Sequence, residues 1–292
     1  MTRKIVAEHG VVCRLPGERL GYFGWPSIDR MDDGALVVAS SGLRTEHVCP
    51  FGKTVLNFSK DDGLTWSPPQ VINDSPMDDR DAGVVALGGK RLLVSWFTSD
   101  TRIYLGWAKK GLPPDELARW DEALGKWTDE MVRQWLGSWI LLTEDGRMWS
   151  QPIRVPLTTP HGPIRLANGE LLYFGKRRLA GGEKHEGDIM ACRSADGGRT
   201  WTELGSVPVC DGTRVLNYHE PHVVELENGR LVGLIRFQHE GKDDPAKNHI
   251  NFCMFQTESD DGGRSEDSRL SDKPSRSGRL ARVDPGKRLD RE

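Results

Sequence analysis

The chain has 292 residues, of which 37% are hydrophobic and ten are tryptophan, so it is long enough to bury a large core in one domain. Its net charge of −3 argues against nucleic acid and against an anionic membrane surface as partners.

No part of the chain has the composition of a targeting or membrane-spanning segment. Met1-Thr2-Arg3-Lys4 is not followed by an apolar run of signal-peptide length, and no segment approaches about 18 consecutive apolar residues. We therefore expect a cytoplasmic location. The five cysteines are scattered without the spacing of a metal site, so we expect free thiols, no metal and no cofactor.

Pairs of short apolar segments recur along the chain, each pair joined by a turn that contains glycine. Apolar residues are dense and often β-branched in them, as is typical of buried hairpin strands. The four pairs, each with its turn, span Pro26–Val38, Val84–Val94, Pro163–Leu172 and Pro221–Val232. One strand–turn–strand unit that returns at long intervals is typical of a β-propeller.

One interval between these units is longer than the others. The units start near residues 26, 82, 163 and 221, in steps of 56, 81 and 58, so the second unit carries an insertion of roughly 24 residues. We place it at 113–136, where Pro113-Pro114-Asp115-Glu116 is a sound helix start. Apolar residues then follow at helical spacing: Leu117, Trp120, Leu124, Trp127, Met131 and Trp135. This helix either caps the propeller or lines its mouth, or it offers a surface to a membrane or a partner.

A short phrase with the consensus S-x-D-x-G-x-T-W follows the paired segments. Full copies occupy 59–66 and 194–201, a shortened copy occupies 143–149, and a fourth begins at Ser259 but has Glu266 in place of tryptophan. The Asp accepts from its own turn's amides, Gly supplies a positive φ, and Thr and Trp resume a strand. We therefore assign a structural role to Asp61, Gly63, Trp66, Asp145, Asp196, Gly198, Trp201 and Asp261.

The phrase resembles the Asp-box, or BNR repeat, of the sialidase (neuraminidase) superfamily. The resemblance implies an all-β fold of the six-bladed propeller type, in which residues 1–265 supply about four blades and the helical insertion. It also implies a truncated chain that lacks the last blades.

Residues 266–292 have a different composition from the rest of the chain. They contain no aromatic residue, and 14 of their 27 positions are Asp, Glu, Lys or Arg. Such a stretch buries too little apolar area to offset its ordering entropy, so we expect a disordered charged tail that limited proteolysis removes first.

Polar ligand groups of a propeller gather where its inner strands begin, because those ends converge on the central axis. Counting nine residues back from each hairpin turn gives Trp25, Asp81 and Glu220, and Pro160 with His161 beside it. We expect Asp81 and Glu220 to face one another across the axis. Trp25 then either stacks on a sugar ring or plugs the channel.

The segment Asn217–Leu226, followed by Arg236, resembles the sialidase segment that carries two active-site groups. By that resemblance Glu220 is the base that activates a tyrosine nucleophile, and Arg236 belongs to the arginine triad that grips the sugar carboxylate. A guanidinium suits this task because it binds a carboxylate bidentately. The nucleophile and the third arginine belong to the family's last blades, so the chain by itself is expected to be inactive.

Two departures from the family pattern affect the other site residues. Gly24 stands where the family's Phe-Arg-Ile-Pro motif has its first triad arginine. In the loop that carries the family's acid/base aspartate, this chain has Arg44-Thr45-Glu46-His47-Val48, so Glu46 or His47 would serve as general acid.

The remaining candidates are substrate contacts. Lys176 is repeat-equivalent to Arg236 and offers a cation to an acidic sugar, or it is simply solvated. The full set of expected substrate contacts is Arg236, Arg44, Lys176, Trp25 and His161.

The resemblance implies a sialidase-like glycoside hydrolase of the exo-α-sialidase type, whose partner is a glycan with a terminal acidic sugar. Two alternatives remain open. Gly24 favours a non-catalytic carbohydrate-binding propeller, and Tyr218 with His219 hints at a polysaccharide lyase on the same scaffold.

Overall fold

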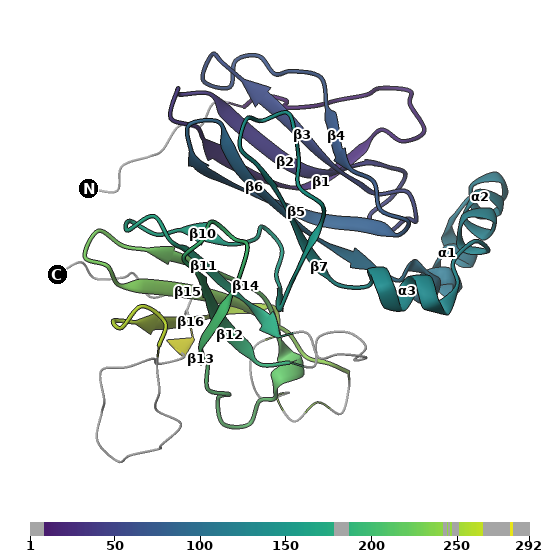
Figure 1. Cartoon of the computed structure of the whole chain (residues 1–292). Coiled ribbons are helices and arrows are strands. Elements are labelled where there is room, and N and C mark those ends of the chain that lie inside the picture. The colour runs from purple at the N-terminus through teal and green to yellow at the C-terminus, as the bar shows by residue number, and fades with distance from the viewer. Residues whose placement is uncertain are drawn as a thin grey trace.

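The computed structural model describes residues 9–177, 187–241, 244, 246 and 251–264, and the backbone of 281–282. Its β-strands form four antiparallel sheets, which are the blades of a propeller (Figure 1). The all-β propeller fold predicted from the repeats is therefore confirmed.

In the first, second and fourth blades the strands follow one another as a meander, each pairing with the next. The first blade has β1 (Tyr22–Arg30), β2 (Leu36–Arg44), β3 (Lys53–Ser59) and β4 (Gln70–Asn73). The second has β5 (Asp78–Gly88), β6 (Arg91–Ser99), β7 (Ser138–Thr143) and β8 (Ile153–Val155).

The third blade has a broken inner strand, because β9 and β10 both pair with β11. Its strands are β9 (Leu157–Thr158), β10 (Ile164–Arg165), β11 (Leu171–Arg177), β12 (Ile189–Ser194) and β13 (Thr202–Ser206). After the short 3-10 helix η2 (Val215–Asn217), the fourth blade has β14 (Tyr218–Glu225), β15 (Leu231–Phe237), β16 (Cys253–Ser259) and β17 (Ala281–Arg282).

The core lies between the blades, and this explains the continuous apolar runs. Side chains alternate between the two faces of a strand, so each face of β5 meets a different neighbour. Val84 and Ala86 pack against the first blade, whereas Val85 and Leu87 pack against the third. A strand that is buried on both faces has no polar face to show in its sequence.

In the first three blades the repeated phrase forms the turn between the third and fourth strands. In the first copy Thr65 N donates to Asp61 Oδ1 at 2.8 Å, and Trp66 Nε1 donates to the carbonyl of Gly63 at 3.1 Å. The copy at 194–201 repeats both contacts: Thr200 N donates to Asp196 Oδ1 at 2.9 Å, and Trp201 Nε1 donates to the carbonyl of Gly198 at 3.1 Å. The turn is therefore held by local hydrogen bonds that the sequence itself specifies.

Helical structure interrupts the second blade between β6 and β7. It comprises η1 (Thr101–Tyr104), α1 (Leu105–Gly111), α2 (Pro114–Leu124) and α3 (Asp129–Trp135). The helices begin earlier than the sequence prediction of 113–136, because the Asp100 side chain accepts from Arg102 N and starts η1. They project beside the sheets at the end of β6 (Figure 1).

The tryptophan-rich stripe of this insertion faces the protein's own core. Trp120 is fully buried and Trp127 nearly so, in a cluster with Val48, Cys49 and Met77 from the first two blades. Of the two interpretations left open by the sequence, the structure thus favours packing against the propeller.

Three other expectations can be placed on the structure. Cys13, Cys49 and Cys192 are free thiols. Among the described residues, no helix is both long and apolar enough to cross a membrane. The tail expected at 266–292 lies outside the described residues, except for the two residues of β17, which pair with β16.

Substitutions at two glycines with positive φ test how tightly the third blade packs on the second. A Cβ on Gly198 (φ +97°) would lie 2.6 Å from Leu93 Cδ1, whereas one on Gly229 (φ +81°) would meet nothing within 4 Å. Gly229→Ala should cost only the left-handed backbone strain, about 1–2 kcal/mol. Gly198→Ala should cost about 1–3 kcal/mol more because the core is overpacked. Urea unfolding measures the free energy of unfolding of both variants. An equal loss in the two would show that the interface between the second and third blades adjusts to the added methyl group without cost.

Candidate active site

The inner strands of the blades carry a bulge at equivalent positions. The pairing register shifts between Gly24 and Ser27 in β1, between Arg80 and Gly83 in β5, and between His219 and His222 in β14. Each interval contains one residue in the left-handed backbone region: Trp25 (φ +50°), Asp81 (φ +51°) and Glu220 (φ +46°). In the third blade His161 (φ +74°) takes this place, between β9 and β10.

A left-handed conformation is costly for residues other than glycine, on the order of 1–3 kcal/mol each. Its occurrence at the same place in four blades shows that the bulge is a regular element of this architecture. All four bulge residues line one cleft of about 830 Å³. The positions obtained by counting back from the hairpin turns therefore meet in one place.

Most other residues singled out in the sequence reach the same cleft. His47, Lys176 and Arg236 line it, whereas Glu46 and Arg44 do not. The cleft also contains residues that the sequence analysis did not identify, among them Arg80, Phe97 and Arg133.

Asp81 is the buried carboxylate of the cleft. Its Oδ1 is buried and accepts no hydrogen bond from any described residue, and its nearest cation is Arg80, whose Nε lies 3.8 Å away. Burial raises the pKa of Asp81 to about 6, and the charge of Glu220 adds to this shift while Arg80 opposes it. Asp81 therefore exchanges a proton near neutral pH, as a general acid must.

Glu220 is the exposed carboxylate of the cleft. Its Oε1 forms an ion pair with Arg236 NH1 at 2.8 Å, and both side chains are accessible, at 43% and 35% exposure. The cleft thus holds one carboxylate that keeps a proton easily and one that is paired with a cation. Two carboxyl groups in different environments, one buried and one exposed, are a common arrangement for acid–base chemistry.

The histidines next to these carboxylates are held neutral. His161 Nδ1 lies 2.8 Å from Ser27 Oγ, and burial lowers the pKa of His161 although Glu220 opposes it. Burial, followed by the charges of Arg80 and Arg44, lowers the pKa of His47. A neutral imidazole is a weak acid, so the general-acid role expected of His47 suits Asp81 better.

Lys176 has a second task besides lining the cleft. It is 2% exposed, and its Nζ donates to the carbonyls of Val215 (3.0 Å) and Tyr218 (2.8 Å), which fixes the start of β14. Burial lowers the pKa of Lys176 to about 8. Tyr218 is itself buried and its hydroxyl accepts from Cys210 N at 3.0 Å, so it does not reach the cleft where a lyase base would act.

Trp25 lies between two arginines. The guanidinium carbon of Arg80 is 4.9 Å from its ring centroid and that of Arg44 is 5.3 Å away, while the His47 ring meets it edge-on at 4.8 Å. These cation–π contacts hold the indole in one orientation. Arg80, which also lines the cleft, therefore supplies a cation next to Trp25. Its signal in the sequence is the charged run Asp78-Asp79-Arg80-Asp81 that opens an otherwise apolar strand.

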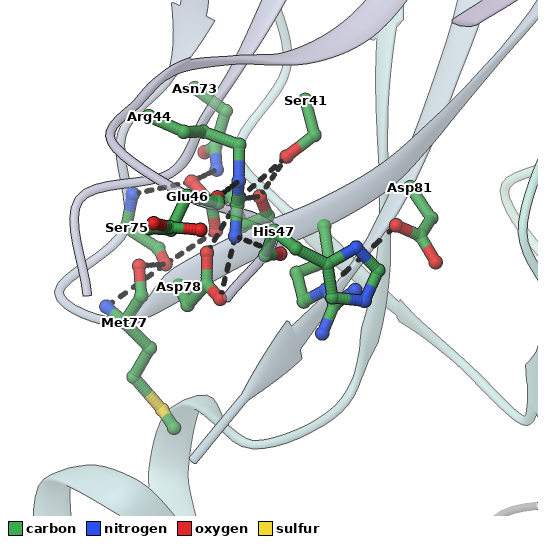
Figure 2. A network of polar contacts seen from close by, with 11 residues as sticks. Ser41, Arg44, Glu46, His47, Asn73, Ser75, Met77, Asp78 and Asp81 are labelled. Carbon is green, nitrogen blue, oxygen red and sulfur yellow. Dashed lines mark hydrogen bonds and ion pairs between the residues drawn. The ribbon is translucent and has the colours of Figure 1, made fainter. Parts of the chain in front are cut away.

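Arg44, expected to contact substrate, is instead fully buried at the centre of a polar network (Figure 2). It forms a two-pronged ion pair with Asp78, from NH1 at 2.6 Å and from NH2 at 3.0 Å. It also donates to the carbonyls of Glu46, His47 and Asp79. Arg44 therefore joins the loop of His47 to the strand of Asp81, and this replaces its expected role.

No ligand-rich metal site accompanies these residues. Within the described ranges, no group of three or more His, Cys, Asp or Glu side chains is arranged to hold a metal ion.

Comparisons with known proteins place this fold. No protein-family model matches the chain, and none of the curated proteins matches it. A protein of unknown function from Dyadobacter fermentans is 21% identical over 87% of this chain and 69% of its own, with a TM-score of 0.58. A Hadza microbial sialidase is 17% identical over 83% of this chain and 45% of its own, with a TM-score of 0.53.

The NanB sialidase from Streptococcus pneumoniae is 12% identical, over 94% of this chain and 54% of its own, with a TM-score of 0.55. The chain thus spans about half the length of these two sialidases. At such identities the likeness shows a sialidase-like propeller fold.

Asp79, in the network beneath the cleft, gives a prediction for stability. It is fully buried and accepts from Asn73 Nδ2 and from Ser75 N and Oγ, yet burial raises its pKa to about 7. The unfolded value is about 4, so the folded state holds the proton more tightly, and this stabilisation is lost as pH rises through about 7.

The free energy of unfolding of the wild type, relative to Asp79→Asn, should therefore fall by on the order of 2 kcal/mol from pH 5 to pH 8. Urea unfolding of both proteins at the two pH values measures this difference. The same difference at both values would mean that Asp79 stays ionised.

Proposed function

We propose that the cleft binds the terminal acidic sugar of a glycan and belongs to a sialidase-like glycoside hydrolase. The observation that carries this proposal is the convergence of Asp81, Glu220, Trp25 and Arg236 in one cleft on a sialidase-like propeller. A carboxylic acid, a second carboxylate, an aromatic ring for stacking and a cation are four of the groups that such a reaction uses, and sialidases add a tyrosine nucleophile, which the resemblance assigns to the family's last blades.

Each residue then has a defined task. Arg236 binds the sugar carboxylate, and in doing so exchanges its ion pair with Glu220 for one with the substrate. Asp81 donates its proton to the leaving oxygen, for which its raised pKa prepares it. Glu220, released from Arg236, takes the proton of the tyrosine nucleophile that the sialidase resemblance implies, and the tyrosine oxygen displaces the leaving oxygen from the sugar. Trp25 packs on the sugar ring.

The first test is charge selectivity. The wild-type chain should bind 3′-sialyllactose at least tenfold more tightly than lactose, measured by calorimetry, because only the former carries a carboxylate. Arg236→Ala should remove most of this preference, whereas Arg147→Ala, an exposed arginine in the turn before β8 and outside the cleft, should keep it. Equal binding of the two sugars by the wild type would contradict the proposal.

A second test uses the proton of Asp81. Above about pH 6 this carboxyl becomes an anion beside the bound carboxylate, so the affinity for sialyllactose should fall between pH 5 and pH 7. Asp81→Asn cannot ionise, and its affinity should change little over this range. A pH profile that the variant leaves unaltered would place the titrating group elsewhere.

Turnover separates the proposed hydrolase from its rival. In a homologue that carries the family's full set of blades, hydrolysis of a fluorogenic sialoside that the Gln variant at the position of Glu220 abolishes, with binding retained, supports the enzyme. Binding without any turnover by that homologue supports a non-catalytic carbohydrate-binding propeller, which Gly24 also favours. The present chain is expected to be inactive in either case.

A further inference from the structure

The helical insertion forms one wall of the cleft. Residues 100–137, which are 38 residues, separate β6 from β7, whereas only the eight residues 45–52 separate β2 from β3. Both loops follow the second strand of a blade and so open at the same end, where His47 lies. From the longer loop Ile103, Tyr104, Asp129 and Arg133 line the cleft.

This wall is preformed. Arg102 is bound on both sides, by Asp100 at 2.9 Å and by Asp129 at 2.8 Å, which ties η1 to the first turn of α3. Thr98 Oγ1 donates to the carbonyl of Trp135 at 2.6 Å, and Trp120 anchors the helices in their own core. A wall held in this way offers a ligand surface without a cost of ordering.

The wall presents groups that suit a sugar and that the bulge residues do not use. Ile103 lines the cleft although 52% of its surface is exposed, and Tyr104 follows it. The carboxylate of Asp129 forms its ion pair with Arg102. Arg133, one turn further along α3, is an exposed cation that lines the cleft. An apolar patch beside a cation provides both stacking and hydrogen bonding to a polar ring.

The size of the cleft agrees with a second binding position. Cavities of roughly 300–1,000 Å³ accommodate ligands of drug size, and this cleft of about 830 Å³ is near the upper end of that range. The four bulge residues converge near the axis, so a single terminal sugar held there leaves the side toward the insertion unfilled.

We propose that the insertion forms a second subsite, in which Ile103, Tyr104 and Arg133 bind the sugar next to the terminal acidic one. The ligand of this cleft is then an oligosaccharide of at least two residues, and the linkage between them lies near Asp81. This inference rests on the proposed function, because it extends the same cleft outward from Arg236.

The experiment compares two ligands that share the terminal sugar, the methyl α-glycoside of N-acetylneuraminic acid and 3′-sialyllactose. The wild-type chain should bind the trisaccharide about tenfold more tightly. Arg133→Ala should reduce this advantage to less than about threefold and leave the affinity for the methyl glycoside unchanged. Ile103→Ser should act in the same direction, and Arg147→Ala serves as the matched control outside the cleft.

The outcomes distinguish the two proposals. Equal affinity for both ligands, or an Arg133→Ala variant that weakens both alike, overturns the subsite and leaves the terminal-sugar site standing. If neither ligand binds the wild type, the proposed function fails and the subsite fails with it. Circular dichroism of Arg133→Ala should match the wild type, because this exposed side chain lies outside the core of the insertion.

Discussion

The bulge in the inner strand of each blade is the constraint on which the cleft depends. In a regular strand successive side chains alternate between the two faces, and in a propeller both faces are filled by neighbouring blades. A residue in the left-handed region breaks the alternation and turns its side chain out of the packed interface. Trp25, Asp81, His161 and Glu220 all reach the cleft by this one device.

The strain of these bulges is offset by the packing and polar contacts around them. Ser27, which follows Trp25 by two residues, donates to the carbonyl of Ala82 at 3.0 Å and also lies against His161. The bulges of three blades are therefore linked to one another. Arg44 adds a further link, because its ion pair with Asp78 crosses from the first blade to the second. Breaking a buried pair of this kind leaves an uncompensated charge, which makes the cleft and the fold interdependent.

Much of the fold could be predicted because its signals are local. The turn phrase encodes its own hydrogen bonds, and in three blades the bulge residue lies nine residues before the hairpin turn, so counting finds Asp81 and Glu220. Arg44 and Arg80 could not be assigned in this way. Both are buried arginines at strand positions, and only their surroundings decide that Arg44 is enclosed by its ion pair with Asp78 while Arg80 still lines the cleft. The charged run that opens β5 predicts that its charges are paired, because unpaired charges are rarely buried. It does not predict which residues are their partners.

The repeated bulge also makes the cleft modular in an engineering sense. The backbone of each blade, rather than the identity of its bulge residue, decides where that side chain points. Four positions that are far apart in the sequence thus direct whatever side chain they carry toward the same cleft. His161 also contacts Ser27 of the first blade, so a library randomised at 25, 81 and 220 would alter the chemistry of the cleft and keep this link between blades. Asparagine and aspartate, which tolerate the left-handed region best among the larger residues, are the natural starting occupants of such a library.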